Sequence, residues 1–220
     1  METSLHRQLK ALYCAEASSQ EVRVDGYRID AVVRGRLIEI QQGSLAALRD
    51  KVRTLLDNYD VTVVKPLVAR KLLVRRKKAG GAVLSTRYSP RRETVADVFS
   101  DLVHFVGVFP HPRLTLEVVL TLQEEHRAPA RKRRWRGPDF KVLDRLLVGV
   151  ESRVTLKDSQ DLASFLPSTL AEVFSTAEIA REASMPRWLA QKMAYCLRKT
   201  GAIDVAGKRG NAWLYQRAAG

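Results

Sequence analysis

The chain has 220 residues, and its 38 Lys and Arg against 24 Asp and Glu give a formal net charge of +14. This balance favours an anionic partner, nucleic acid before membrane. Two cysteines, Cys14 and Cys196, exclude a cysteine-rich zinc module and suit a reducing cytoplasm. The sequence contains no signal peptide, no apolar run of about 18 residues and no Walker or dinucleotide-binding motif. We therefore expect a cytoplasmic protein with no membrane partner and no nucleotide cofactor.

The first part of the chain predicts a mixed α/β sheet flanked by helices. A helix-like segment at 4–17 precedes three strand-like runs, "EVRVDGY", "YRIDAVV" and "LIEIQ". Ser44 is a suitable N-cap, and apolar residues then recur at helical spacing as far as Tyr59. The next run, "VTVVKPLVA", is typical of a buried strand. The predicted order is helix, three strands, helix, strand.

Two of these strand-like runs each contain an acid, Asp30 and Glu39. If Arg34 and Gly35 form a two-residue turn, the hairpin places the two carboxylates opposite each other. Like charges in that position destabilise a strand pair, and a divalent cation between them would convert repulsion into coordination. Oxygen ligands suit Mg²⁺ or Mn²⁺. Acids on strands are also found simply solvated on an open face, so both interpretations stand at this point.

The order of elements and the acid spacing together resemble the PD-(D/E)XK nuclease superfamily, which includes restriction endonucleases and Holliday-junction resolvases. Asp30 and the triplet Glu39-Ile40-Gln41 carry the resemblance, over about the first 75 residues. The resemblance implies a restriction-endonuclease-like fold with Mg²⁺ as cofactor, for which Mn²⁺ would substitute. Asp30, Glu39 and the Ile40 carbonyl would be the metal ligands. The sequence departs from the family where Gln41 replaces the usual lysine of the triplet.

The departure at Gln41 raises the question of how the attacking water is activated. Gln41 can orient a water by hydrogen bonding but carries no charge. Lys51 could supply the charge, since it lies on one flank of the second helix, whereas Arg49 lies on the other flank. Either cation could equally be an ordinary solvated side chain. The predicted catalytic residues are therefore Asp30, Glu39, Gln41 and Lys51.

The middle of the chain has a weaker pattern. Residues 75–93 are basic and contain glycine, which predicts a loop or hairpin, and an amphipathic helix follows the Thr94 cap. The run "RLTLEVVLTL" predicts a strand that extends the sheet, whereas the dense basic run 127–137 is typical of a solvated segment or a nucleic-acid clamp. Residues 139–157 have short strand-like pieces without an assigned role. We expect a nuclease-like domain at 1–125, a basic connecting region at 126–160 and a third unit at 161–220.

The third unit resembles a winged helix-turn-helix domain. Ser175 and Glu178 form a capping-box pattern, Pro186 suits the first turn of a second helix, and Gly201 ends that helix. Two strand-like runs, "AIDVA" and "AWLYQ", flank the basic turn "GKRGN". The pattern predicts helix, turn, helix and a two-stranded wing.

The second helix of this unit has two predicted faces. Leu189, Met193 and Leu197 would face inward. The other face combines cationic, amide and aromatic groups that suit a DNA major groove: Arg187, Gln191, Tyr195 and Arg198. Lys208 and Arg209 at the wing tip would meet phosphate or the minor groove. The alternative is a winged helix that contacts protein, with its charges solvated.

These patterns together predict a Mg²⁺-dependent endodeoxyribonuclease that hydrolyses phosphodiester bonds of duplex or branched DNA, in repair, recombination or defence. The alternative from a different class is a non-catalytic DNA-binding protein or transcription regulator on an inactivated nuclease scaffold, which Gln41 keeps open. The sequence also leaves open whether two chains pair as a homodimer.

Overall fold

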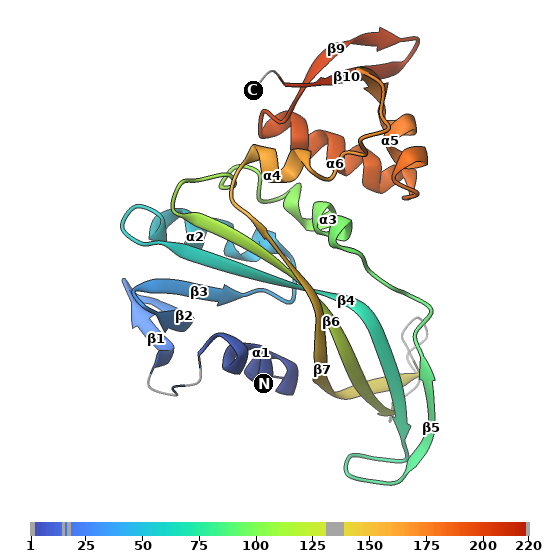
Figure 1. The fold of residues 1–220 in the computed structure, drawn as a ribbon. Coiled ribbons are helices and arrows are strands. Elements are labelled where there is room, and N and C mark those ends of the chain that lie inside the picture. Colours follow the sequence, from blue (N-terminus) through green and yellow to red (C-terminus); the bar gives the residue numbers. More distant parts are fainter. Residues whose placement is uncertain (1–2, 15, 17–18, 131–138, 219–220) are drawn as a thin grey trace.

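The computed structural model describes residues 3–14, 16, 19–130 and 139–218. A seven-stranded mixed sheet with helices on both faces forms the larger part, and a three-stranded antiparallel sheet with helices forms the C-terminal part (Figure 1). This is the predicted fold class, α/β with a C-terminal winged helix. Most of the predicted basic run at 127–137 lies outside the described residues.

The first six predicted elements are present in the predicted order. They are α1 (Ser4–Tyr13), β1 (Gln20–Val24), β2 (Tyr27–Val33), β3 (Arg36–Ile40), α2 (Arg49–Leu55) with the 3-10 helix η2 (Leu45–Leu48) before it, and β4 (Val61–Arg76). The Ser44 hydroxyl accepts a hydrogen bond from the Ala46 amide, which confirms the predicted cap. Arg34 and Gly35 have φ of 51° and 77°, as a type I′ turn requires, and fix the predicted β2–β3 hairpin.

The sheet has the order β1-β2-β3-β4-β6-β7, with β5 paired to the far end of β4. The first three strands are antiparallel neighbours, and β4 runs parallel to β3. β6 (Leu114–Pro129) runs parallel to β4, and β7 (Phe140–Leu156) is antiparallel to β6. β5 (Val83–Tyr88) forms with β4 the predicted basic hairpin, which projects from the sheet (Figure 1).

The boundaries predicted around a connecting region at 126–160 are wrong. β6 continues past residue 125 to Pro129, and β7 occupies residues 140–156 as a full strand of the sheet. β7 was not predicted from the sequence because it lacks the usual alternation of apolar and polar residues. Most of its residues are half-buried or exposed, so neither face needs to be consistently apolar. Its pairing with β6 makes it part of the larger domain.

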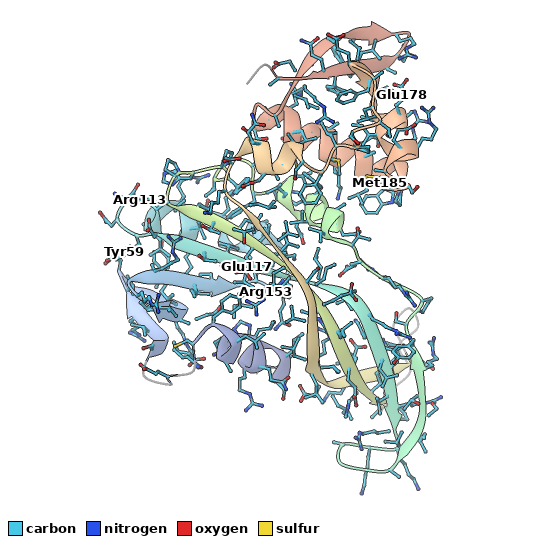
Figure 2. All side chains as sticks on the ribbon, in the orientation of Figure 1. Tyr59, Arg113, Glu117, Arg153, Glu178 and Met185 are labelled. Atoms are coloured by element: carbon cyan, nitrogen blue, oxygen red, sulfur yellow. The ribbon has the colours of Figure 1, made fainter. Side chains whose placement is uncertain are left out.

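Helix α1 covers one face of the sheet. Its buried Leu5 and Leu9 pack against a small core that also contains Ala31, Ile38, Ile40, Val64 and Val119. A polar contact fixes the end of the helix, where the Tyr13 hydroxyl donates to Glu117 at 2.8 Å. Glu117 on β6 also pairs with Arg153 on β7 at 3.4 Å (Figure 2). This contact joins α1 to two strands that follow it by more than a hundred residues.

The other face carries α2, then η3 (Val95–Val98) and α3 (Phe99–Leu102), and above them the C-terminal unit (Figure 1). One hydrophobic core runs from the sheet through α3 into that unit. The rings of Phe99 and Phe165 meet edge to face at 5.2 Å, and the Lys192 ammonium donates to the Ser100 carbonyl at 3.2 Å. The C-terminal unit is therefore packed on α3 rather than tethered by an extended linker.

The C-terminal unit has the predicted winged-helix order. Its elements are α4 (Ser159–Ala163), β8 (Val173–Ser175), α5 (Thr176–Glu182), α6 (Arg187–Lys199), β9 (Ile203–Arg209) and β10 (Ala212–Arg217). Ser175 and Glu178 form the predicted capping box, with a 2.7 Å bond between their side chains (Figure 2). β9 and β10 form the wing, and β8 pairs with β10.

Candidate functional site

The two acids of the hairpin lie where the hairpin opens. Cα pairing runs from Val33–Arg36 to Ala31–Ile38, so Asp30 falls opposite Glu39, where the ladder ends. There the Ile40 amide donates to Asp30 Oδ2 at 2.7 Å. The next amide, that of Gln41, points the other way and donates to β4. Since backbone groups alternate in direction along a strand, the Ile40 carbonyl points to the same side as Asp30.

Asp30 is held from two sides. Its Oδ1 lies 3.0 Å from His6 Nε2 on α1, and its Oδ2 accepts the Ile40 amide. Burial alone would raise the pKa of Asp30, but the hydrogen bonds from His6 and the Ile40 amide outweigh it, so the pKa is lowered. Asp30 is therefore a fixed, ionised carboxylate at neutral pH.

Glu39 is the more buried of the two acids, with 4% of the residue exposed. Lys51 Nζ lies 2.6 Å from Glu39 Oε1 and also donates to the Arg28 carbonyl at 2.5 Å. The pKa of Glu39 is raised, first because burial disfavours its charge; the Lys51 ammonium opposes the rise and the nearby Asp30 carboxylate adds to it. Lys51 thus connects α2 to the Glu39 carboxylate on β3 and to the backbone of β2.

The remaining predicted catalytic groups differ in their placement. The Gln41 side-chain amide donates to the Ser44 carbonyl at 2.7 Å, so its N–H group is directed into the loop after β3. Arg49 pairs with the neighbouring Asp50 at 3.2 Å. Of the two helix cations weighed from the sequence, Lys51 is the one in contact with an acid of the hairpin.

The donor set can be compared with the needs of a divalent cation. In the described part of the chain, no group of three or more His, Cys, Asp and Glu side chains is arranged to hold a metal ion. The available donors are two carboxylates, from Asp30 and Glu39, and the Ile40 carbonyl. Mg²⁺ commonly takes one or two protein carboxylates and completes its shell with water and substrate phosphate. These donors fit that pattern, although His6 and Lys51 now contact the two acids.

His6 is the member of the cluster that the sequence did not reveal. It lies 24 positions before Asp30 and forms no recognisable motif with it. The available signal was indirect, because His6 follows the buried Leu5 on the helix whose apolar stripe faces the hairpin. The contact depends on how α1 packs, and spacing along the chain does not encode it.

The predicted DNA-facing residues form a separate surface on α6 and the wing. Leu189, Met193 and Leu197 are buried as predicted. The predicted groove face is exposed throughout: Arg187, Gln191, Tyr195 and Arg198. At the wing, the Lys208 ammonium lies 4.0 Å from the centre of the Trp213 ring, and Arg209 contacts Glu178 at 3.5 Å. Both wing cations are exposed.

Fold and site together define an α/β protein with a winged helix and a cluster of two acids and a lysine. Residues 3–157 match the model of a family described as a domain of unknown function (DUF8091), and the chain belongs to that family. A Treponema pallidum (strain Nichols) protein, described as uncharacterized, is 30% identical over 217 residues, covering 98% of this chain and 85% of that protein. No solved structure matches the chain. Among the described residues, no helix is long and apolar enough to cross a membrane.

Proposed function

We propose that the protein is a metal-dependent endonuclease that hydrolyses phosphodiester bonds of duplex or branched DNA. One observation carries the proposal: at the open end of the β2–β3 hairpin, Asp30 accepts the Ile40 amide, and the neighbouring Glu39 contacts Lys51. These residues lie within the order helix, three strands, helix, strand, which resembles the core of PD-(D/E)XK nucleases. The net charge of +14 supports a nucleic-acid substrate.

Each residue of the cluster has a distinct role in this proposal. Asp30, Glu39 and the Ile40 carbonyl would hold Mg²⁺ or Mn²⁺. The bound ion supplies a Lewis acid for the phosphoryl oxygen and lowers the pKa of its water. His6 positions Asp30, whose Oδ1 it contacts. Lys51 provides, from α2, the positive charge that Gln41 lacks, and it can orient the attacking water or the phosphate beside Glu39.

The winged helix is the proposed DNA-positioning unit. Its exposed cationic and amide face can contact base edges and phosphates, and its wing adds Lys208 and Arg209. α6 packs through Lys192 on α3 of the larger domain. Because the two units share one core, DNA bound by α6 would be held in a fixed relation to the hairpin.

The test is nicking of supercoiled plasmid and of flap and junction oligonucleotides, with and without Mg²⁺. We expect the parent protein to cut only with the metal. The double variant Asp30→Asn/Glu39→Gln should cut about 10⁴-fold more slowly, the scale on which loss of central catalytic groups acts. Arg49→Ala, on the same helix as Lys51 but paired with Asp50, is the matched control and should cut normally.

A second candidate is a non-catalytic DNA-binding protein. The observation in its favour is that both carboxylates already have partners, His6 and Lys51, while no third acidic ligand stands beside them in the described residues. In that case the parent would bind DNA without cutting any substrate in Mg²⁺ or Mn²⁺. Arg187→Ala and Arg198→Ala would still weaken binding. Each lost phosphate contact would reduce the slope of log Kd against log salt concentration by about one unit.

A further inference from the structure

A row of side chains crosses the far half of the sheet, beyond the end of β3. Arg87 on β5 pairs with Leu73 on β4, which lies beside Glu125 on β6, which in turn pairs with Arg145 on β7. Side chains of residues paired in register share one face of a sheet. Four strands thus bring two arginines and one acid onto the same surface.

Glu125 gathers three cations on this surface. With 2% exposure it is deeply buried. Its carboxylate accepts hydrogen bonds from Arg127 at 2.7 Å, from Arg145 at 2.8 Å and from Lys71 at 3.3 Å. One negative charge is set against three positive charges, so the cluster keeps an excess of positive charge. The shared acid also fixes the directions of the two guanidinium groups, which limits the entropy they would lose on binding an anion.

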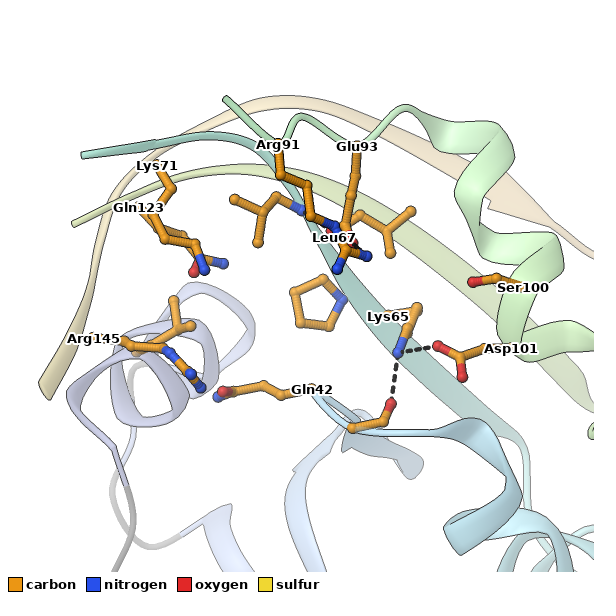
Figure 3. Close-up of a pocket in the computed structure, with 14 residues that line it drawn as sticks. Gln42, Lys65, Leu67, Lys71, Arg91, Glu93, Ser100, Asp101, Gln123 and Arg145 are labelled. Carbon is orange, nitrogen blue, oxygen red and sulfur yellow. Dashed lines mark hydrogen bonds and ion pairs between the residues drawn. The ribbon is translucent and has the colours of Figure 1, made fainter. Parts of the chain in front are cut away.

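Two hollows follow β4 along this face. The first, of about 290 Å³, begins at Gln42 and Gly43, directly after the candidate site, and Lys71, Arg91 and Arg145 reach into it (Figure 3). The second, of about 240 Å³, lies further along β4. Its cations are Arg75, Arg87 and Arg127. The first hollow combines lysines and arginines with two acids, Glu93 and Asp101, which pair with Arg91 and Lys65. The second combines three arginines with one acid, Asp139.

The hairpin at the end of this face adds further charge. From residue 70 to residue 92 the chain has nine cations and no acid: Arg70, Lys71, Arg75, Arg76, Lys77, Lys78, Arg87, Arg91 and Arg92. Arg75 and Arg87 are exposed, and neither has an ion pair within the described part of the chain. The guanidinium groups of these two arginines are therefore accessible to a ligand.

We propose that Lys71, Arg75, Arg87, Arg91, Arg127 and Arg145 form a phosphate track, a surface that binds the DNA backbone as it leaves the candidate site. Guanidinium groups bind phosphate oxygens in a bidentate manner, which suits arginines held in fixed positions. From residue 65 to residue 75, β4 spans roughly 33 Å, which is about the axial rise of ten base pairs of duplex DNA. The start of the track rests on the proposed nuclease site, whereas DNA binding by the track does not require cleavage.

The test measures DNA binding by the full chain. Fluorescence anisotropy of labelled DNA in EDTA gives the Kd at each salt concentration of a series. We expect Arg75→Ala/Arg87→Ala to raise the Kd about tenfold at low salt and to flatten the salt slope by about two units, one for each lost contact. The control is Arg23→Ala, an exposed arginine on β1 at the opposite edge of the sheet, which should bind like the parent. Thermal melting should be the same for all three proteins.

A length series locates the contact. With duplexes from about 8 to about 30 base pairs, parent affinity should rise until the DNA spans the track, and the double variant should gain less from the added length. Equal Kd values and equal salt slopes for the double variant and the Arg23→Ala control would overturn the proposal and leave a purely structural ion network. Because the readout is binding in EDTA, absence of cleavage by the parent would count against the nuclease proposal alone.

Discussion

Two buried carboxylates of the same sheet, Glu39 and Glu125, lie in opposite electrostatic surroundings. Glu39 on β3 has one cation, Lys51, and a second acid, Asp30, close by; its pKa is raised, first by burial. Glu125 on β6 is also buried, but the hydrogen bonds that it accepts from Arg145 and Arg127 outweigh burial and lower its pKa to about 2. The strands that carry them both pair with β4, one on each side.

The difference indicates which ligand each cluster can accept. Around Glu39 and Asp30, two carboxylates are set against the Lys51 ammonium and the His6 imidazole, so this is the cluster in which the proposed Mg²⁺ would be stabilised. Around Glu125, three cations share one carboxylate, so an anion would be stabilised there. If both proposals hold, a cation site lies beside a phosphate-binding surface, the combination that phosphodiester hydrolysis needs, since charge grows on the phosphate as the bond breaks.

The largest effect that sharpens this comparison is expected at Lys51. In the proposed nuclease, Lys51→Ala removes the charge beside Glu39 and should slow single-turnover cleavage by about 10² to 10³-fold, as loss of one preorganised positive or donor group does. DNA affinity, measured separately, should stay within about twofold because the phosphate track and the winged helix are untouched. A Lys51→Ala protein that cuts at the parent rate would show that the Glu39 cluster works without its ammonium group.

Next in size is the stability cost of removing the charge of Glu125. Glu125→Gln keeps the volume of the side chain but leaves Lys71, Arg127 and Arg145 without their shared acid. We expect a loss of about 2 kcal/mol in the free energy of unfolding, less than for a fully buried ion pair because the cations reach solvent. Urea denaturation measures it, with Glu151→Gln, an exposed acid on β7, as the control.

The two acids should also respond to pH in opposite directions. The folded pKa of Glu125, about 2, lies below its unfolded value near 4.5, so its contribution is complete above pH 4.5 and is lost as pH falls towards 2. Glu39 has a raised folded pKa, so its protonation at falling pH favours the folded state. The difference in unfolding free energy between the parent and Glu125→Gln should therefore be smaller at pH 3 than at pH 6. A constant difference between them would contradict the assigned pKa shift.

The surroundings of Glu39 could be predicted from the sequence in larger part than those of Glu125. The residues around Glu39 come from one short stretch of the chain. A type I′ turn at Arg34 and Gly35 sets the register of the hairpin, and the Ser44 cap starts the helical segment that places Lys51 beside Glu39. These features are encoded within about 25 residues, and the sequence predicted them. The contact of Asp30 with His6 was not predictable, since it depends on the packing of α1 against the sheet.

The Glu125 cluster was beyond sequence reasoning for a related reason. Its cations come from β4, β6 and β7, and the position of β7 in the sheet was itself missed. Residues of β7 are half-buried on both faces, so they lack the alternation by which strands are recognised. Only the pairing of three strands distant in the sequence brings Lys71, Arg127 and Arg145 to one carboxylate.

A smaller effect is expected from Mg²⁺ on thermal stability, and it tests whether the Glu39 cluster, rather than the Glu125 cluster, binds the ion. If Asp30 and Glu39 bind the ion only when the chain is folded, Mg²⁺ at ten times its Kd should stabilise the parent by about 1.4 kcal/mol. For a chain of this size that is a rise in Tm of about 3–5 °C. Glu39→Gln should lose the rise and Glu125→Gln should keep it. An equal rise in both variants would place the bound ion elsewhere.

The smallest effect is expected at Gln41. In the proposed nuclease, it decides which residue takes the role of the lysine in the PD-(D/E)XK motif that the sequence resembles. The Gln41 amide N–H group is held by the Ser44 carbonyl at 2.7 Å, whereas Lys51 contacts Glu39 directly at 2.6 Å. If Lys51 supplies the charge, Gln41→Ala should reduce single-turnover cleavage by less than about tenfold, well below the loss for an essential positioning group. A fall as large as that of Lys51→Ala would mean that Gln41 orients the nucleophile through its side-chain carbonyl oxygen. Combining Gln41→Ala with Lys51→Ala then distinguishes the two cases, because residues that act on one water are not additive, whereas independent residues multiply their effects.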